Sequence, residues 1–341
     1  MKTLKVGIIG LGRMGQEHLT ILSEYFSYAK VKAVCDVEFN TQAKELIKKY
    51  GIREKYTDYK EMLLDPLIDI IYVCTPIEVL ADIAIDCVKA NKHTFCEENL
   101  SIDVDTILKL KEDLSKSKVK FMVGLNKRFD INFISVREAV LSGKIGDPHI
   151  VKITSRDPDF PSLEYMKTSG GLFFDMTPND FDKARYLIGS EIDEVFAMGA
   201  VLIDDFVKEI DDIDTATINV RLKNGALVVI DNSRRAVYGY DQRIEVHGSL
   251  GMVTTSNEQQ SKAKIYTNYG VIEEKPQYQL IKRYRQSFVK ETEHFLECII
   301  DDKKPITGCD DALSSLYASK AALKSYKENR PVKISEVMEK N

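Results

Sequence analysis

A glycine motif near the N-terminus constrains the fold of this chain more than any other feature. It follows an apolar run at residues 4–9 and precedes a stretch with helical spacing. Glycines at its first, third and sixth positions allow a tight turn, close approach of the backbone to a pyrophosphate, and close packing of helix on strand. The pattern predicts a strand–turn–helix unit that binds a dinucleotide. The motif consists of Gly10, Leu11, Gly12, Arg13, Met14 and Gly15.

An acidic residue stands where a dinucleotide-binding unit needs one. Asp36 ends the next apolar run, residues 31–36, and a carboxylate there can bond the adenosine ribose hydroxyls. It would repel the extra phosphate of NADP, and residues 37–39 offer no cation. We therefore predict NAD, rather than NADP, as the cofactor. The alternative for the motif as a whole is a glycine-rich turn that binds no ligand. Thr75 and Pro76 follow a later strand, at the edge where open sheets bind ligands, although a plain strand-ending turn is the alternative.

The first third of the chain alternates short apolar runs with helical stretches, which predicts a doubly wound parallel sheet. The expected strands are 4–9, 31–36, 68–74, 93–96 and 120–124, and the expected helices are 18–29, 41–50, 80–90 and 104–117. Consecutive β-rich runs follow and predict an α+β domain on a large open, mainly antiparallel sheet. These runs are 150–155, 194–201, 215–222, 226–233 and 243–248, with helices at 284–300 and 310–328. We predict a Rossmann domain at 1–123 and a substrate and oligomerisation domain at 124–341.

Composition excludes several classes of protein. Of 341 residues, 44% are hydrophobic and 30% are charged, a balance typical of folded globular chains. The net charge of -5 gives no general attraction to nucleic acid, and no apolar run approaches the roughly 18 residues that span a bilayer. Six cysteines without a CxxC pair and five histidines without ligand spacing predict reduced thiols and no metal site. We expect a cytoplasmic protein with no nucleic-acid or membrane partner.

Nine motifs along the chain resemble those of the glucose–fructose oxidoreductase and inositol dehydrogenase family, most closely its inositol 2-dehydrogenase branch. They are GLGRMGQEH (10–18), CTP (74–76), FCEENLS (95–101), GLNKRFD (124–130), TSRDP (154–158), SGGLFFDM (169–176), NDFDKARYL (179–187), IDNSRRAVYGYDQR (230–243) and EVHGSLG (245–251). The resemblance implies an N-terminal domain that binds NAD(P), with Glu97 near the cofactor. It also implies a C-terminal domain that holds a polyol or sugar, whose sheet commonly forms an oligomer interface.

The chain departs from the family pattern at its two proton-handling positions. The family usually carries Glu-Lys-Pro where this chain has Glu97-Glu98-Asn99, so a charge of +1 becomes -1. The family also carries a histidine four residues after the aspartate matched by Asp175, and Asn179 stands there instead. That histidine normally exchanges the hydroxyl proton during hydride transfer, whereas an asparagine amide cannot titrate.

Other residues could supply the missing proton chemistry. Lys127 stands where many relatives have an arginine, and a partly buried lysine can shuttle a proton. For every acidic candidate the alternative is a structural role. For Tyr238 the alternative is plain packing in the sheet. The predicted catalytic residues are Glu98, Lys127, Asp175 and Asn179, and the predicted substrate-binding residues are Asp157, Asp182 and Tyr238.

Together these observations predict an NAD-dependent oxidoreductase that acts on a hydroxyl of a cyclitol or sugar, with an altered proton relay. A non-catalytic NAD- and sugar-binding pseudoenzyme, serving as a sensor or partner subunit, is the main alternative. A lyase or epimerase-like reaction on the same fold is a further one. We also expect a homo-oligomer, a tetramer or a dimer.

Overall fold

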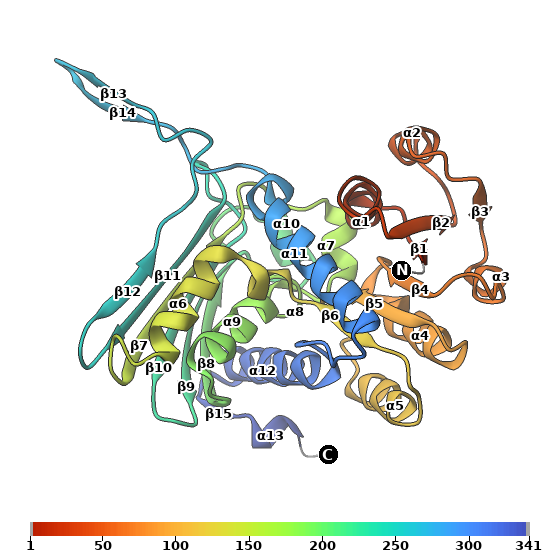
Figure 1. Cartoon of the computed structure of the whole chain (residues 1–341). Coiled ribbons are helices and arrows are strands. Elements are labelled where there is room, and N and C mark those ends of the chain that lie inside the picture. The colour runs from red at the N-terminus through yellow and green to blue at the C-terminus, as the bar shows by residue number, and fades with distance from the viewer. Residues whose placement is uncertain (1–2, 339–341) are drawn as a thin grey trace. The chain divides into compact units, whose positions relative to one another are not determined.

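A computed structural model describes residues 3–338, and these form two compact units (Figure 1). The first unit contains the residues up to Asn126 together with Gln286–Leu313. The second contains Lys127–Arg285 together with the residues from Ser314 on. The chain therefore returns to its first unit near its C-terminal end. The predicted assignment of cofactor and substrate roles to 1–123 and 124–341 stays a prediction.

The first unit is built on a six-stranded sheet in which every neighbouring pair is parallel. The strand order is β3-β2-β1-β4-β5-β6. Its strands are β1 (Leu4–Ile9), β2 (Ala29–Cys35), β3 (Glu54–Tyr56), β4 (Ile70–Val73), β5 (His93–Glu97) and β6 (Phe121–Gly124). The order reverses direction between β1 and β4, and open sheets bind ligands at the carboxyl ends of strands at such a point. The predicted doubly wound sheet is confirmed.

Five α-helices connect these strands, and they cover both faces of the sheet. They are α1 (Arg13–Tyr25), α2 (Thr41–Lys49), α3 (Tyr59–Leu63), α4 (Ile77–Lys89) and α5 (Val104–Ser115). Since both faces are covered, the central strands are apolar throughout, and all four residues of β4 are buried. Helix α1 begins at Arg13, inside the glycine motif, rather than at residue 18 as predicted. The short elements β3 and α3 were not predicted.

The second unit is built on a seven-stranded sheet in the order β12-β11-β7-β10-β9-β8-β15. Its strands are β7 (Pro148–Arg156), β8 (Ile192–Ala200), β9 (Thr215–Leu222), β10 (Leu227–Ser233), β11 (Asp241–Gly248), β12 (Met252–Thr255) and β15 (Val332–Lys333). Neighbours are antiparallel except β7 and β10, which run parallel. The predicted mainly antiparallel sheet is confirmed. Gly225, with φ of 93°, lies in the turn that joins β9 to β10.

Several helices of the second unit were not predicted. Its described helices are the 3-10 turn η1 (Asn126–Phe129), which begins in the first unit, α6 (Ile131–Leu141), α7 (Leu163–Thr168), α8 (Leu172–Asp175), α9 (Pro178–Ile188), α10 (Phe206–Glu209) and α13 (Ser335–Met338). Two long helices, α11 (Leu280–Ile300) and α12 (Cys309–Glu328), contribute to both units. The expectation that strands follow one another without intervening helices is wrong between β7 and β8. Helices α7, α8 and α9 lie there, and the expectation is also wrong between β8 and β9, where α10 lies.

One face of the seven-stranded sheet is covered and the other is open. Helices α6 and α9 pack on the covered face (Figure 1). Along β9 the side chains alternate between buried and exposed, as the two-residue period of a half-covered strand requires. A two-stranded hairpin, β13 (Lys264–Thr267) and β14 (Gly270–Glu273), projects beyond this sheet (Figure 1). The unit therefore leaves a sheet face and a hairpin uncovered.

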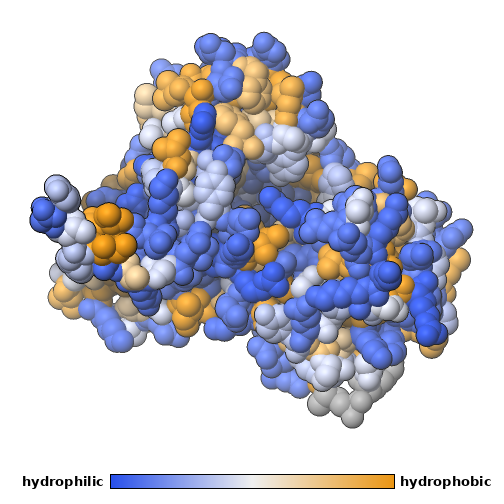
Figure 2. Space-filling model, turned by 90° about the horizontal axis from the view of Figure 1, so that it is seen from above, coloured by the Kyte–Doolittle hydropathy of each residue, from blue (hydrophilic) through white to orange (hydrophobic). Residues whose placement is uncertain are grey.

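The face drawn in Figure 2 is mainly hydrophilic, with hydrophobic residues in separate patches. Within residues 3–338, no helix is long and apolar enough to cross a membrane.

All six cysteines lie in the described part and are free thiols, five of them buried and Cys74 partly exposed. That these thiols are reduced in the cell stays a prediction.

Candidate active site

Packing requires glycine at two positions of the motif and leaves space at the third. A Cβ atom at Gly10 would lie 2.5 Å from the carbonyl oxygen of Cys74, and Gly10 has φ of 86°, which favours glycine. A Cβ atom at Gly15 would lie 1.9 Å from the carbonyl oxygen of Gly10. A Cβ atom at Gly12 would meet nothing within 4 Å. The loop thus packs tightly on the end of β4 while its middle glycine borders open space.

The start of α1 is suited to a phosphate group. Gly12 is the N-cap residue, no side chain caps the helix, and the first turn carries no acidic residue. Free N–H groups and the positive end of the helix dipole attract anions at such a position. Asp36, directly after β2, accepts a hydrogen bond from the backbone N–H of Leu11 at 2.6 Å. Its carboxylate is therefore held beside the glycine loop, where a ribose contact needs it.

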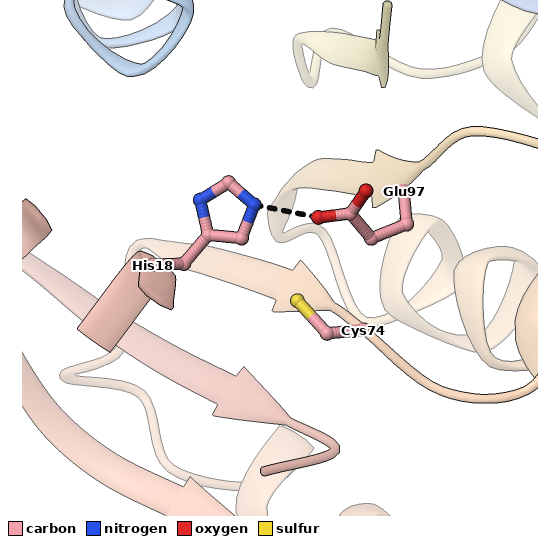
Figure 3. A group of neighbouring side chains, drawn as sticks. All are labelled: His18, Cys74 and Glu97. Atoms are coloured by element: carbon pink, nitrogen blue, oxygen red, sulfur yellow. Dashed lines mark hydrogen bonds and ion pairs between the residues drawn. The ribbon is translucent and has the colours of Figure 1, made fainter. Parts of the chain in front are cut away.

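Three potential metal ligands from separate elements meet beside this loop (Figure 3). The ligand atoms of His18, Cys74 and Glu97 lie within 4.8 Å of one another, and the His18 Nε2 to Glu97 Oε1 distance is 2.6 Å. His18 is fully buried against the rings of Tyr72 and Phe95. Sequence spacing could not reveal this group, because the three residues come from α1 and the ends of β4 and β5. The hydrogen bond between imidazole and carboxylate is sufficient reason for the closeness of the pair.

The segment after β5 is acidic and has an unusual backbone. Asn99 has φ of 62°, which asparagine tolerates and which the ring of a proline forbids. The chain thus differs from the family pattern at two adjacent positions: Glu98 replaces the lysine, and Asn99 replaces the proline. Glu291 of α11 is buried, and its burial together with the carboxylates of Glu97 and Glu98 raises its pKa well above the usual value. Glu98 therefore adds a negative charge to a region that already contains the carboxyl groups of Glu97 and Glu291.

In the second unit, polar side chains gather where β7 and β10 end side by side. The side-chain amide of Asn232, on β10, donates to Asp180 Oδ2 at 2.7 Å. Its carbonyl accepts from the Thr177 hydroxyl at 2.8 Å, and Asp180 also pairs with Lys183 at 2.6 Å. These bonds fix the first turn of α9, and with it Asn179, to the end of the sheet.

Asp157 directly follows β7 in this cluster. Its pKa is raised to about 6, mainly by burial, and the carboxylates of Asp175 and Asp180 act in the same direction. The cations of Lys127 and Arg234 oppose this rise. The structure therefore brings together three of the predicted residues, Asp157, Asp175 and Lys127. Asn179 belongs to the same cluster because its neighbour in the sequence, Asp180, acts on Asp157.

Two of these four residues are buried with hydrogen-bonding capacity to spare. Lys127 is 8% exposed, its Nζ lies 6.0 Å from the centre of the Tyr284 ring, and it pairs with no carboxylate among residues 3–338. Asn179 is 6% exposed, and within the same residues its side chain makes no hydrogen bond. Asp175, by contrast, pairs with Arg234 at 2.8 Å and accepts from the Tyr165 hydroxyl at 2.6 Å.

The two remaining predicted ligands are engaged elsewhere. Both carboxylate oxygens of Asp182 accept from Arg128, at 2.9 and 2.6 Å. The Tyr238 hydroxyl donates to Asp241 at 2.6 Å and accepts from Arg156 at 3.1 Å. Both side chains thus have structural partners, and their predicted roles in substrate binding stay predictions.

Comparison with known proteins decides the family. Residues 4–125 match an oxidoreductase family with an NAD-binding Rossmann fold, and residues 133–254 match the GFO/IDH/MocA C-terminal domain. Myo-inositol 2-dehydrogenase of Thermotoga maritima is 41% identical over 98% of this chain and 100% of its own length. The chain belongs to the GFO/IDH/MocA oxidoreductase family. This confirms the resemblance inferred from the motifs, the Rossmann fold and the NAD cofactor.

Other members of the GFO/IDH/MocA family match over the same length. Inositol 2-dehydrogenase of Rhizobium meliloti is 37% identical over 98% of this chain and 100% of its own. The structure of scyllo-inositol dehydrogenase from Lactobacillus casei with bound NAD(H) and scyllo-inositol has a TM-score of 0.91. It is 26% identical and covers 98% of this chain and 100% of its own. The likeness thus extends across both units.

Proposed function

We propose that this protein is an NAD-dependent dehydrogenase that oxidises a secondary hydroxyl of a cyclitol, or of a related sugar. One observation carries the proposal: an intact dinucleotide loop belongs to a chain whose second unit holds a buried cluster of carboxylates, an amide and a cation. Such a cluster can bind several hydroxyl groups at once. The named activities of its full-length relatives support inositols as the first substrates to test.

The first unit would hold NAD, which accepts the hydride. The glycine loop and the start of α1 would bind its pyrophosphate, and Asp36 its adenosine ribose. The carboxylate of Asp36 favours NAD over NADP. Thr75, Pro76 and Glu97 lie at the ends of β4 and β5, the edge at which ligands of open sheets bind, and we assign them to the cofactor site.

The proposed reaction residues differ in what they can do with a proton. Lys127 supplies a buried positive charge that stabilises a developing alkoxide. Asn179 can orient a hydroxyl by hydrogen bonding but cannot accept its proton, and Asp175 is held by Arg234. Glu98 places a negative charge where the family pattern has a lysine. We therefore expect hydride transfer to be slow in the chain as it stands.

A non-catalytic NAD- and polyol-binding protein is the second candidate, and the pair Glu98 and Asn179 favours it. The test is NADH formation at 340 nm with a panel of inositols and sugars at pH 7 to 9, with NAD binding measured by calorimetry. Slow NADH formation that depends on the polyol supports the enzyme. Binding of NAD and polyol without NADH formation from any compound supports the pseudoenzyme.

We also propose a cytoplasmic homo-oligomer, a dimer or a tetramer. Large apolar side chains are exposed on the open sheet face and on the hairpin, and such patches mark interfaces. On the sheet they are Ile150, Met198, Leu227, Val229 and Met252, and on the hairpin Ile265, Tyr266, Tyr269, Val271 and Ile272. Free cysteines throughout the chain fit a reducing compartment.

A further inference from the structure

Oxidation of an alcohol by NAD requires an acceptor for one proton. The C–H bond breaks and its electron pair leaves with the hydrogen for nicotinamide C4, while the O–H bond breaks and a carbonyl forms. The hydroxyl proton must pass to a base, and Asn179 cannot take it. On the basis of the function proposed above, we propose that the carboxylate of Asp157 takes this proton.

The partners of the neighbouring acidic residues single out Asp157. Asp175 pairs with Arg234, Asp180 with Lys183 and Asn232, and Asp182 with Arg128. A carboxylate committed to a close cation is a weak base, because the cation stabilises its charge. Within residues 3–338, the side chain of Asp157 makes no hydrogen bond and no ion pair. Its oxygens are therefore available to a substrate hydroxyl.

The backbone holds Asp157 firmly in this position. Its N–H donates to the carbonyl oxygen of Ser233 at 2.9 Å, and its own carbonyl accepts from the N–H of Ala236 at 2.6 Å. The residue thus extends the parallel pair of β7 and β10 by one step. The residue keeps partial exposure although the groups around it are mostly buried. A fixed, reachable carboxylate is what proton abstraction requires.

The charges around Asp157 suit a base that works near neutral pH. Two carboxylates face it, Asp175 from the end of α8 and Asp180 from α9, and two cations face it, Lys127 from η1 and Arg234 from the segment after β10. Burial and the carboxylates raise its pKa to about 6, against the two cations. The group is then ionised at pH 7 yet far more basic than an ordinary aspartate. Catalysis is most efficient when the pKa of the base lies near the working pH.

The test compares Asp157→Asn in two backgrounds, the natural chain and Asn179→His. In the natural chain we expect kcat with myo- or scyllo-inositol to fall by about 10²-fold or more, the typical loss of a general base, with NAD binding unchanged. In the Asn179→His background we expect a loss below about 10-fold, because the imidazole then accepts the proton. Asp159→Asn is the matched control, since Asp159 is exposed and bonds to Tyr278, and it should leave kcat unchanged.

A pH profile adds an independent readout. We expect kcat/KM of the natural chain to fall tenfold per pH unit below about pH 6 and to level off above it. Equal losses from Asp157→Asn in both backgrounds, expressed mainly in KM, would show a substrate ligand rather than a base and overturn the inference. It is also overturned if the natural chain is inactive while Asn179→His turns over. If no variant forms NADH from any polyol, the proposed function itself fails.

Discussion

The carboxylates in this chain differ in their capacity to accept a proton, because their hydrogen-bond and ion-pair partners differ. Asp180 is fully buried but bonded to Lys183 and Asn232, whereas Asp157 lies in the same cluster without such a bond. Folding therefore places the carboxyl group of Asp157 where its negative charge is disfavoured. Functional sites commonly combine such destabilised groups with rigid surroundings. The same property that suits Asp157 to accept a proton should reduce the stability of the protein.

Replacing Asp157 by Asn should stabilise the protein in a pH-dependent manner. The folded-state pKa of about 6 exceeds the usual 3.8, so the wild-type protein loses stability as the pH rises from about 4 to about 6. Asparagine does not ionise and avoids this loss. We expect a gain of about 3 kcal/mol at pH 7.5 and about half of that at pH 5, measured by urea unfolding. A gain that is equal at both pH values would contradict the raised pKa.

Replacing Asp36 by Ala should weaken the binding of NAD and reduce the preference for NAD over NADP. The variant loses a charged acceptor for the ribose and the bond that holds the N–H of Leu11. Hydrogen bonds to charged groups contribute about 1.5–3 kcal/mol, so NAD affinity should fall roughly 10- to 100-fold in calorimetry. Glu38→Ala, at an exposed neighbour, is the control and should bind NAD normally. Absence of NAD binding by the unchanged protein at millimolar ligand would defeat the assignment.

Among the elements, helix α9 is marked much less clearly by its sequence than the first-unit strands are. Five of the six first-unit strands are largely apolar runs, and the glycine motif marks the turn after β1, so these were predictable, whereas β3, with the sequence Glu-Lys-Tyr, was not. Helix α9 begins with Pro178, and its buried residues include Asn179, Asp180, Asp182 and Lys183. Its apolar residues Phe181, Ala184, Leu187 and Ile188 do recur at helical spacing, but the run is short and its buried first turn is polar, so the pattern did not lead to a predicted helix.

Contacts between elements distant in the sequence were not predictable. The pairing of His18 with Glu97 joins residues 79 apart, and the parallel pairing of β7 with β10 joins residues about 77 apart. No local pattern encodes either contact. The motifs supplied the candidate residues of the cluster around Asp157, but its mutual arrangement and the different partners of its carboxylates came only from the structure.

The attachment of α9 to β10 should depend on Asn232. Replacing it by Leu removes the amide bond to Asp180 and the acceptor for Thr177, and it leaves polar groups buried without partners. Such losses destabilise proteins by about 2–4 kcal/mol, which urea unfolding can measure. Gln42→Leu, on the exposed side of α2, is the control and should change stability by less than about 0.5 kcal/mol. Equal effects of both variants would refute this role of Asn232.

At the scale of the whole molecule, the exposed apolar surface points to self-association. The hairpin residue Ile272 is 60% exposed, a high value for an aliphatic side chain. We expect Ile272→Asp to reduce the mass measured by light scattering at micromolar concentration. Asn268→Asp, which adds the same charge at the exposed hairpin turn, should not. If the unchanged protein already has a mass near one 38.7 kDa chain, the proposed oligomer is wrong.

We propose that this chain combines an intact NAD-dependent polyol dehydrogenase framework with an altered proton relay. Its most direct test is kcat/KM with myo- or scyllo-inositol for the unchanged chain, Glu98→Lys, Asn179→His and the double variant. Because the family pattern assigns both positions to one reaction step, their effects should not be independent. We predict slow turnover by the unchanged chain and a gain for the double variant that exceeds the product of the two single gains. An ordinary turnover of about 1 to 10³ per second by the unchanged chain, lowered by the double change, would contradict the claim.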